Sequence, residues 1–219
     1  MSRAELKQWA KKKIKGHIWE LLIPLIVAGI LSSLTIGQKI IVTDEGWKIN
    51  GGINLSLFFY FVQVGLAYFM VHFIKDKEHE FKDLFRFIND YVRIFVVGLL
   101  STIFIALWAL LLIIPGIIKA IAYSMIPLLL ADDKYKDLGY MEVLKKSEEM
   151  MKGHKMDYFV LGLSYIGWHI LAIFTLGLLE IWIVPYQETA TYRFLSDIKD
   201  DYEKLHGMSK EEEKAPAKK

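Results

Sequence analysis

Residues 94–118 read IFVVGLLSTIFIALWALLLIIPGII, 25 consecutive positions without a charged side chain. A transmembrane α-helix needs about 20 predominantly apolar residues to cross the hydrocarbon core of a bilayer. This stretch is long enough, and the proline and glycine near its end are residues that interrupt helices. Hydrophobic residues make up 54% of the 219-residue chain, more than a soluble domain of this size would bury. The sequence therefore predicts an integral membrane protein.

Four further apolar segments flank this stretch, and a sixth lies near the start of the chain. The segments 53–74 and 158–179 contain no charged residue, and 21–37 is only slightly shorter than a full span. The segments 120–131 and 181–195 are weaker, because the first is short and the second contains charged residues. Hydropathy alone leaves these last two unassigned.

The distribution of lysine and arginine decides between four spans and six. With six spans, 24 of the 27 basic residues fall on one side of the membrane, and the loop 38–52 on the other side carries two. Positive loops are normally cytoplasmic. We therefore expect a single transmembrane domain over residues 1–196 with both termini in the cytoplasm, followed by a charged tail at 197–219 that is disordered from Ser209 on. The expected spans are 18–37, 53–74, 93–114, 116–131, 157–175 and 177–195.

Two connections on the basic side share a motif, which suggests an internal repeat. Lys15-Gly16-His17 recurs as Lys152-Gly153-His154, and each motif enters a span within a few residues. The segment Phe81–Tyr91 precedes the third span, and its apolar residues recur with the spacing of one helical face. Such helices can lie in the membrane interface. The predicted fold is all-α, a polytopic transmembrane bundle of three hairpins with short amphipathic interfacial helices on the cytoplasmic side.

Polar residues in the last two hairpins form a candidate intramembrane site. Lys119 and Glu180 each follow a turn glycine by three positions, which places both about 4–5 Å below the turn. Because an unpaired charge deep in a span costs about 3 kcal/mol, we expect an ion pair between Lys119 and Glu180. His169, within the fifth span, is a candidate for a hydrogen bond across helices. The candidate polar site comprises Lys119, Tyr123, His169, Glu180, Tyr186, Gln187 and Glu188.

Two interpretations of these residues stay open at this point. In the first, they fix the register of a compact bundle and have only a structural role. In the second, they line a cavity that accepts an ion or a small polar solute. Internal repeats are common in transporters, where binding sites lie between repeats, but duplication is also a simple way to build a bundle.

The sequence contains no pattern of catalytic or metal-binding residues that we can identify. There is no cysteine, and Glu78-His79-Glu80 lacks the second histidine that a zinc-protease helix requires. The net charge of +2 gives no general attraction to nucleic acid. We therefore expect a protein that is not an enzyme, binds no cofactor, metal or nucleic acid, and has the lipid bilayer as its surroundings.

Several short motifs in the second half of the chain occur together in a known family. They are PGIIKAIAYSM at 115–125, KGHK at 152–155, SYIGW at 164–168 and IVPY at 183–186. In this order they resemble a bacterial integral membrane family known as domain of unknown function 975, found chiefly in Gram-positive bacteria. Tyr165 stands where the family is expected to have Phe, and Glu180 where it is expected to have a small residue.

The resemblance implies a multi-pass protein of the bacterial cytoplasmic membrane. The family is distantly similar to the membrane domain of glycerophosphodiester phosphodiesterases, whose catalytic domain is absent from this sequence, so no activity is implied. Two functions remain open. One is transport, or assistance to a transporter, with a small polar intramembrane site. The other is a non-enzymatic structural or assembly module that binds membrane proteins or lipids.

Overall fold

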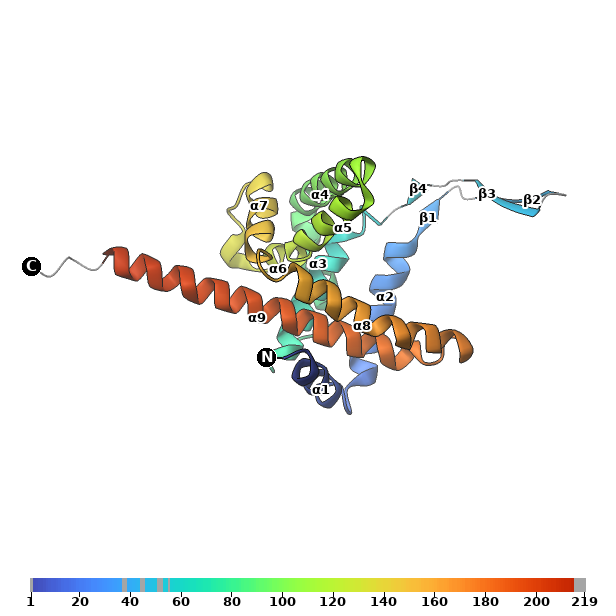
Figure 1. Cartoon of the computed structure of the whole chain (residues 1–219), viewed down its shortest axis with the longest axis horizontal. Helices are drawn as coiled ribbons and strands as arrows, with labels where there is room; N and C mark the ends of the chain where they lie inside the picture. Colours follow the sequence, from blue (N-terminus) through green and yellow to red (C-terminus); the bar gives the residue numbers. More distant parts are fainter. Residues whose placement is uncertain (1, 37–38, 44–45, 51–52, 55, 215–219) are drawn as a thin grey trace, which may run out of the picture.

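The computed structural model describes residues 2–36, 39–43, 46–50, 53–54 and 56–214. Helices account for most of this part of the chain (Figure 1). The α-helices are α1 (Arg3–Lys13), α2 (Ile18–Ser33), α3 (Tyr60–Ile74), α4 (Tyr91–Leu111), α5 (Ile113–Ala122), α6 (Ile126–Leu130), α7 (Tyr140–Met150), α8 (Lys155–Phe174) and α9 (Glu180–Lys214). Two 3₁₀ helices, η1 (Phe81–Asp90) and η2 (Asp133–Tyr135), precede α4 and α7.

The connection between α2 and α3 contains short strands where the ends of two spans were predicted. β1 (Thr35–Ile36) pairs antiparallel with β4 (Ile53–Asn54), and β2 (Lys39–Thr43) pairs antiparallel with β3 (Gly46–Asn50). Runs of β-branched residues, such as Ile-Ile-Val-Thr within β2, favour strands over helices. The predicted spans 18–37 and 53–74 were therefore too long, since α2 ends at Ser33 and α3 begins at Tyr60.

Three helical segments of the described chain are long and apolar enough to cross a membrane. They are Phe81–Leu111, Ile113–Leu130 and Lys155–Phe174. A fourth is obtained if α1 and α2, which are bent by 104° relative to each other, are counted together, and α3 is a shorter apolar helix. The prediction of a helical protein with several helices that are long and apolar enough to cross a membrane is confirmed in this coarse form.

The turn between α4 and α5 occurs earlier than the sequence suggested. We expected it at Ile114-Pro115-Gly116, but the chain turns at Leu112, whose backbone is extended with φ −157° and ψ 139°. Pro115 instead lies in the first turn of α5, where its missing N–H is not needed for helix hydrogen bonds. A Cβ atom at Gly116 would lie 2.7 Å from the Cα of Ala109, so glycine lets the two helices approach closely.

The turn between α8 and α9 lies where it was predicted, around Thr175-Leu176-Gly177. Leu176 and Gly177 have positive φ angles of 52° and 83°. The N–H of Gly177 donates to the carbonyl oxygen of Ala172 at 2.9 Å, which closes the end of α8. Glycine adopts this left-handed conformation without the steric cost that other residues incur.

The helices that precede three of the apolar helices begin in the same way. In α1, η1 and α7, an acidic residue at the third helical position accepts a hydrogen bond from the backbone N–H of the capping residue. Each bond satisfies a backbone N–H that has no partner within the helix, and it places a negative charge near the positive end of the helix dipole. The pairs are Ser2 and Glu5 at 2.7 Å, Glu80 and Asp83 at 2.8 Å, and Gly139 and Glu142 at 2.7 Å.

The two Lys-Gly-His motifs also adopt the same backbone conformation. Gly16 follows α1 with φ 89°, and Gly153 follows α7 with φ 91°. One residue later His17 and His154 are the capping residues of α2 and α8. Each motif therefore forms the sharp bend that joins a polar helix to an apolar one.

The apolar faces of α1 and η1 are covered to different extents. Leu6, Ala10 and Ile14 of α1 are buried, and α1 packs on α9, so this apolar stripe faces the protein rather than lipid. The apolar stripe of α1 is therefore covered by α9, and the position of this helix at the membrane interface stays a prediction. In η1, Leu84 and Phe87 are buried, whereas the apolar side chains of Phe81, Phe85 and Ile88 are exposed.

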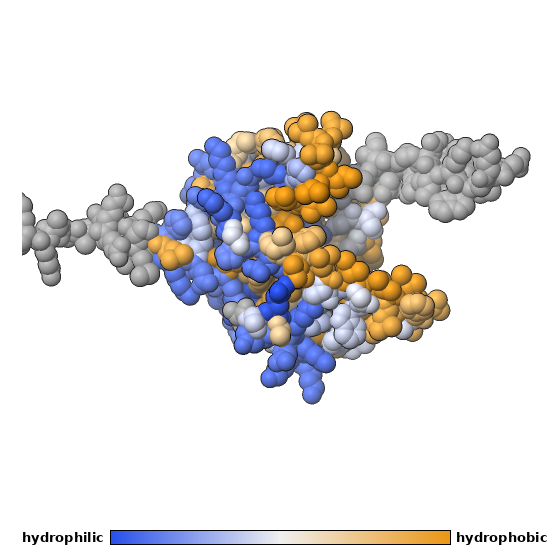
Figure 2. All heavy atoms as spheres, viewed as in Figure 1, coloured by the Kyte–Doolittle hydropathy of each residue, from blue (hydrophilic) through white to orange (hydrophobic). Residues whose placement is uncertain are grey.

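The long helix α9 packs against α1, α2, α3 and α8, and its C-terminal part extends beyond the other helices (Figure 1). It continues to Lys214, so residues 209–214 are helical where disorder was predicted, and residues 215–219 lie outside the described chain. Hydrophobic side chains cover the α4–α5 turn and the α8–α9 hairpin, while hydrophilic ones gather near α1 and α7 (Figure 2). Leu110 and Leu176, at these two turns, are 85% and 94% exposed. Such surfaces are suited to contact with lipid.

Candidate functional site

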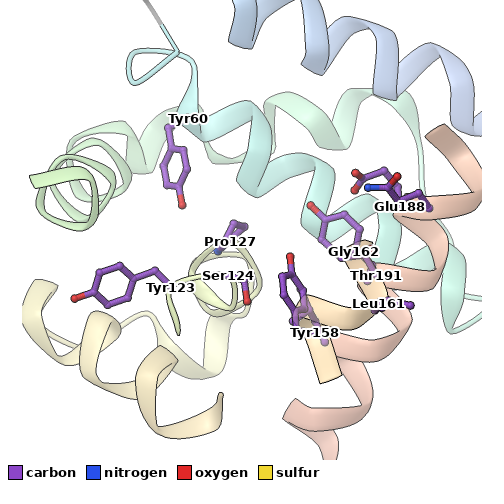
Figure 3. A pocket seen from close by; sticks show the side chains of 12 residues that line it. Tyr60, Tyr123, Ser124, Pro127, Tyr158, Leu161, Gly162, Glu188 and Thr191 are labelled. Atoms are coloured by element: carbon purple, nitrogen blue, oxygen red, sulfur yellow. The ribbon is translucent and has the colours of Figure 1, made fainter. Parts of the chain in front are cut away.

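A polar cavity of about 330 Å³ lies between α3, the junction of α5 and α6, α8 and α9 (Figure 3). Its volume is at the lower end of the range found for small-molecule sites. The walls combine tyrosine side chains with one carboxyl group, a glutamine and two small hydroxyl residues. The polar lining residues are Tyr60, Tyr123, Ser124, Tyr158, Gln187, Glu188, Thr191 and Tyr192.

Helix periodicity on α9 brings three of the lining residues to one side of that helix. Glu188, Thr191 and Tyr192 are separated by three and four positions, which is the spacing of one helical face. Pro185 lies one turn earlier within α9 and provides no N–H for the helix hydrogen bond to the carbonyl of Ile181. This part of α9 therefore combines a polar face with an interrupted hydrogen-bond ladder.

The opposite walls come from separate parts of the chain. Tyr60 is the first residue of α3, and a Cβ atom at Gly98 of α4 would lie 2.8 Å from its Cδ1 atom. Pro127 lines the cavity where α5 gives way to α6, because proline cannot continue the helix of the four preceding residues. On α8, Gly162 adds no side chain beside Tyr158 and so leaves the space open.

The polar groups of the cavity have few partners in the protein. Within the described residues, Glu188 makes no hydrogen bond or ion pair, and neither do the hydroxyls of Tyr60 and Tyr192. The hydroxyls of Tyr60 and Tyr158 point into the cavity, whereas that of Tyr123 points away from it (Figure 3). Glu188 and Tyr60 are half-buried and Tyr192 is buried. Polar groups removed from water normally have a partner, so these groups are available to a ligand or to water.

No basic residue lines the cavity among the residues described, because the neighbouring cations have other partners. The Nζ atom of Lys119 lies 2.6 Å from Oε1 of Glu148. The guanidinium of Arg193 lies 3.0 Å from Asp197 and stacks on the ring of Trp9. In the described chain no group of three potential metal ligands occurs. An ionised Glu188 would therefore give the cavity a single negative charge.

The predicted ion pair between Lys119 and Glu180 was wrong. Since the chain turns at Leu112, Lys119 lies seven residues from the turn, or about 10 Å along α5, rather than beside it. There it meets Glu148 of α7, a helix that packs against α4 and α6. Burial opposes ionisation of Glu148, but the hydrogen bonds from Lys119 and Tyr123 and the positive charges of Lys119 and Lys155 together hold the pKa of this carboxyl below its ordinary value.

Glu180 is instead bound by His169, which confirms the hydrogen bond across helices. Nδ1 of His169 lies 2.8 Å from Oε1 of Glu180, and Nε2 lies 2.7 Å from Oε1 of Gln187. The histidine thus joins α8 to two residues on one face of α9. Tyr186 packs against the ring of Tyr165, with the ring centres 5.3 Å apart.

The seven residues predicted for the site divide into two groups. Tyr123, Gln187 and Glu188 line the cavity, whereas Lys119, His169, Glu180 and Tyr186 lie outside its lining. Sequence reasoning missed Tyr60, Tyr158 and Tyr192. The spacing of Tyr192 from Glu188 on a helical face could have revealed it, but no spacing connects Tyr60, at the start of α3, to α9.

Comparison with known proteins gives one finding. The model of the family described as "Protein of unknown function (DUF975)" matches residues 1–122 and 110–201. No curated protein and no solved structure matches the chain. The two matches together extend over most of the sequence and include the motifs at 115–125, 152–155 and 164–168. The similarity to the membrane domain of glycerophosphodiester phosphodiesterases stays a prediction. The chain belongs to the DUF975 family.

Proposed function

We propose that this protein crosses the bacterial cytoplasmic membrane six times and takes a small polar solute into the cavity beside Glu188, as a transporter or as the solute-binding part of one. The observation that carries this proposal is the carboxyl group of Glu188, which lines a cavity and has no hydrogen-bond or ion-pair partner among the described residues. Ionisable groups at membrane depth are costly, so an unpaired one is by default a candidate for function.

The proposed topology is supported by the apolar helices and by the basic loops. Three helical segments have the length and composition of a span, and α2 and α3 are shorter apolar helices. We assign the sixth crossing to the first part of α9. A topology with six spans places the basic connections on one side of the membrane. Single cysteines in this cysteine-free chain test the arrangement. Lys48→Cys should react with an impermeant maleimide added to cells, whereas Lys82→Cys and Asp137→Cys should react only after permeabilisation.

The position of the cavity supports a role in solute binding. We divide the chain into three helical units, α2–α3, α4–α6 and α8–α9. Each unit follows one of the acid-capped helices, in the order α1, η1 and α7. The cavity receives Tyr60 from the first unit, Ser124 from the second and Glu188 from the third. Transporter sites typically lie between structural repeats, so a cavity bounded by all three units fits such a site.

Native mass spectrometry of the protein purified in mild detergent tests the proposal. A bound solute of low mass should be present in the wild type and absent from Glu188→Gln, which keeps the size of the side chain. Glu180→Gln is the matched control, because this acid lies on the same helix but is bonded to His169 outside the cavity. A wild type free of any small solute, together with no uptake of any tested solute by proteoliposomes, would show that the proposal is wrong.

A second candidate function rests on the exposed side of η1. Phe81, Phe85 and Ile88 form an apolar surface beside the cations Lys82 and Arg86, and Ile88 is 56% exposed. Such a surface is suited to membrane lipid or to another membrane protein, as expected for a structural or assembly module. In that case, replacing Phe81 and Phe85 by serine should release a co-purifying partner or lipid, and Glu188→Gln should not.

A further inference from the structure

The chemistry of the cavity lining restricts the kind of solute that it can hold. We infer that the solute is a small primary amine in its protonated, singly charged form, with the ammonium group beside Glu188. This inference rests on the proposed function, because it assumes that the cavity takes up a solute. The residues that carry it are Glu188, Tyr60, Tyr158 and Tyr192.

The charge of the lining favours a cation. Glu188 is the only charged residue that lines the cavity among those described, and no Lys, Arg or His side chain is in the lining. An anionic solute would place two negative charges together in a poorly solvated site, where like charges repel strongly. A neutral solute would leave the carboxylate without a counterion. A cationic solute removes both costs.

The number of acidic ligands favours a single positive charge over a divalent metal ion. Calcium takes six to eight oxygen ligands and is usually held by several carboxylates. Here there is one carboxylate, and the described residues contain no group of three metal-binding side chains. The volume points the same way. A cavity of 330 Å³ corresponds to about ten water molecules of liquid, so a bare monovalent ion would leave most of it filled with water.

The arrangement of acceptors favours a primary ammonium over a quaternary one. The hydroxyls of Tyr60 and Tyr158 point into the cavity (Figure 3), and together with Glu188 they offer three oxygen acceptors from three different helices. A primary ammonium has three N–H donors, which oxygens of this kind can accept. A quaternary ammonium has no N–H and would leave the hydroxyl of Tyr60 without a partner. The tyrosine rings and Leu161 can then contact the alkyl part of the solute.

Ligand-dependent stabilisation of the purified protein tests this inference. Ethylammonium chloride is titrated against tetramethylammonium chloride, sodium propionate and sodium chloride at equal ionic strength, and the apparent melting temperature is followed by tryptophan fluorescence. Ligands that bind the folded state raise this temperature in a saturable way. We expect a saturable rise with ethylammonium alone, unchanged in Glu180→Gln and abolished in Glu188→Gln. Tyr60→Phe should weaken the apparent affinity about two- to tenfold, the effect of one lost hydrogen bond.

Two results would overturn the inference. One is an ethylammonium effect no larger than that of sodium chloride. The other is a saturable effect of ethylammonium that persists in Glu188→Gln. If Glu188→Gln cannot be purified, an unchanged affinity of Tyr60→Phe for ethylammonium would have the same meaning. If propionate or an uncharged solute stabilises the protein through Glu188 while ethylammonium does not, the ligand class is wrong and the proposed function stands. If native mass spectrometry finds no solute and proteoliposomes take up none of the tested solutes, the proposed function itself fails.

Discussion

The close approach of α3 and η1 depends on Gly65, and adding one methyl group there should have a large effect. A Cβ atom at position 65 would lie 2.1 Å from the carbonyl oxygen of Leu84 and 2.5 Å from its carbonyl carbon. Carbon and oxygen atoms in favourable contact are about 3.3 Å apart, so η1 would have to move by about 1 Å. The obstacle is backbone, which cannot rotate away as the end of a flexible side chain can. Overpacking of this kind costs about 1–3 kcal/mol.

Gly65→Ala also has a favourable component, because alanine stabilises a helix interior by about 1 kcal/mol relative to glycine. With the clash at the upper end of its range, the net loss is about 2 kcal/mol. For a chain of this size 1 kcal/mol corresponds to about 2–4 °C, so the apparent melting temperature should fall by about 4–8 °C. Thermal unfolding in detergent, followed by tryptophan fluorescence, measures this. Gly29→Ala and Gly167→Ala are matched controls, since nothing lies within 4 Å of the added atom in either case. A Gly65→Ala protein as stable as these controls would refute the reasoning.

Two further predictions concern ion pairs outside the cavity. Lys119→Glu should destabilise the protein, and Glu148→Lys in the same chain should recover part of the loss, about 0.2–1 kcal/mol for a partly exposed pair. Combining Lys119→Glu with Glu180→Lys should recover nothing in the same melting assay. The second prediction concerns Asp132, which is hydrogen-bonded to Lys199. Burial opposes ionisation of Asp132, but its interactions with Lys199 and Lys134 together lower the pKa of this carboxyl. These interactions therefore stabilise the fold above about pH 4, and their contribution is lost as the pH falls below that value. Lys199→Met should therefore reduce the acid-dependent fall in melting temperature between pH 5 and pH 3, and an unchanged acid profile would contradict it.

Local features of the fold could be predicted from the sequence where a single segment determines them. The uncharged run at 94–118 predicts apolar helices, and the glycine at 177 predicts the turn between α8 and α9. The turn between α4 and α5 was misplaced because proline is compatible with two positions. It can end a helix or occupy the first turn of the next one, and the sequence does not distinguish between them.

The candidate site was predicted mainly from one helix, and Tyr123 is the one predicted lining residue from another part of the described chain. Gln187 and Glu188 were identified because they are neighbours on a polar side of the sixth predicted span. Tyr60 could not be identified, since its contribution depends on how α3 packs against α4 and α9. The same dependence on packing explains the wrong partner for Lys119. Its distance from the turn was inferred from a local motif, and the position of α7 was not predictable from that motif.

The contrast between the two acids of α9 bears on whether the polar residues are structural or functional. If they served only to hold the bundle together, every costly charge should have a partner. Glu180 is bonded to His169, Lys119 to Glu148 and Arg193 to Asp197. Glu188 has no such partner among the described residues, although it lies on the same helix only eight positions from Glu180. The fold thus satisfies the neighbouring charges and leaves one carboxyl group beside tyrosine hydroxyls in a cavity. This selective absence of a partner is what a binding site requires and what a purely structural role does not explain.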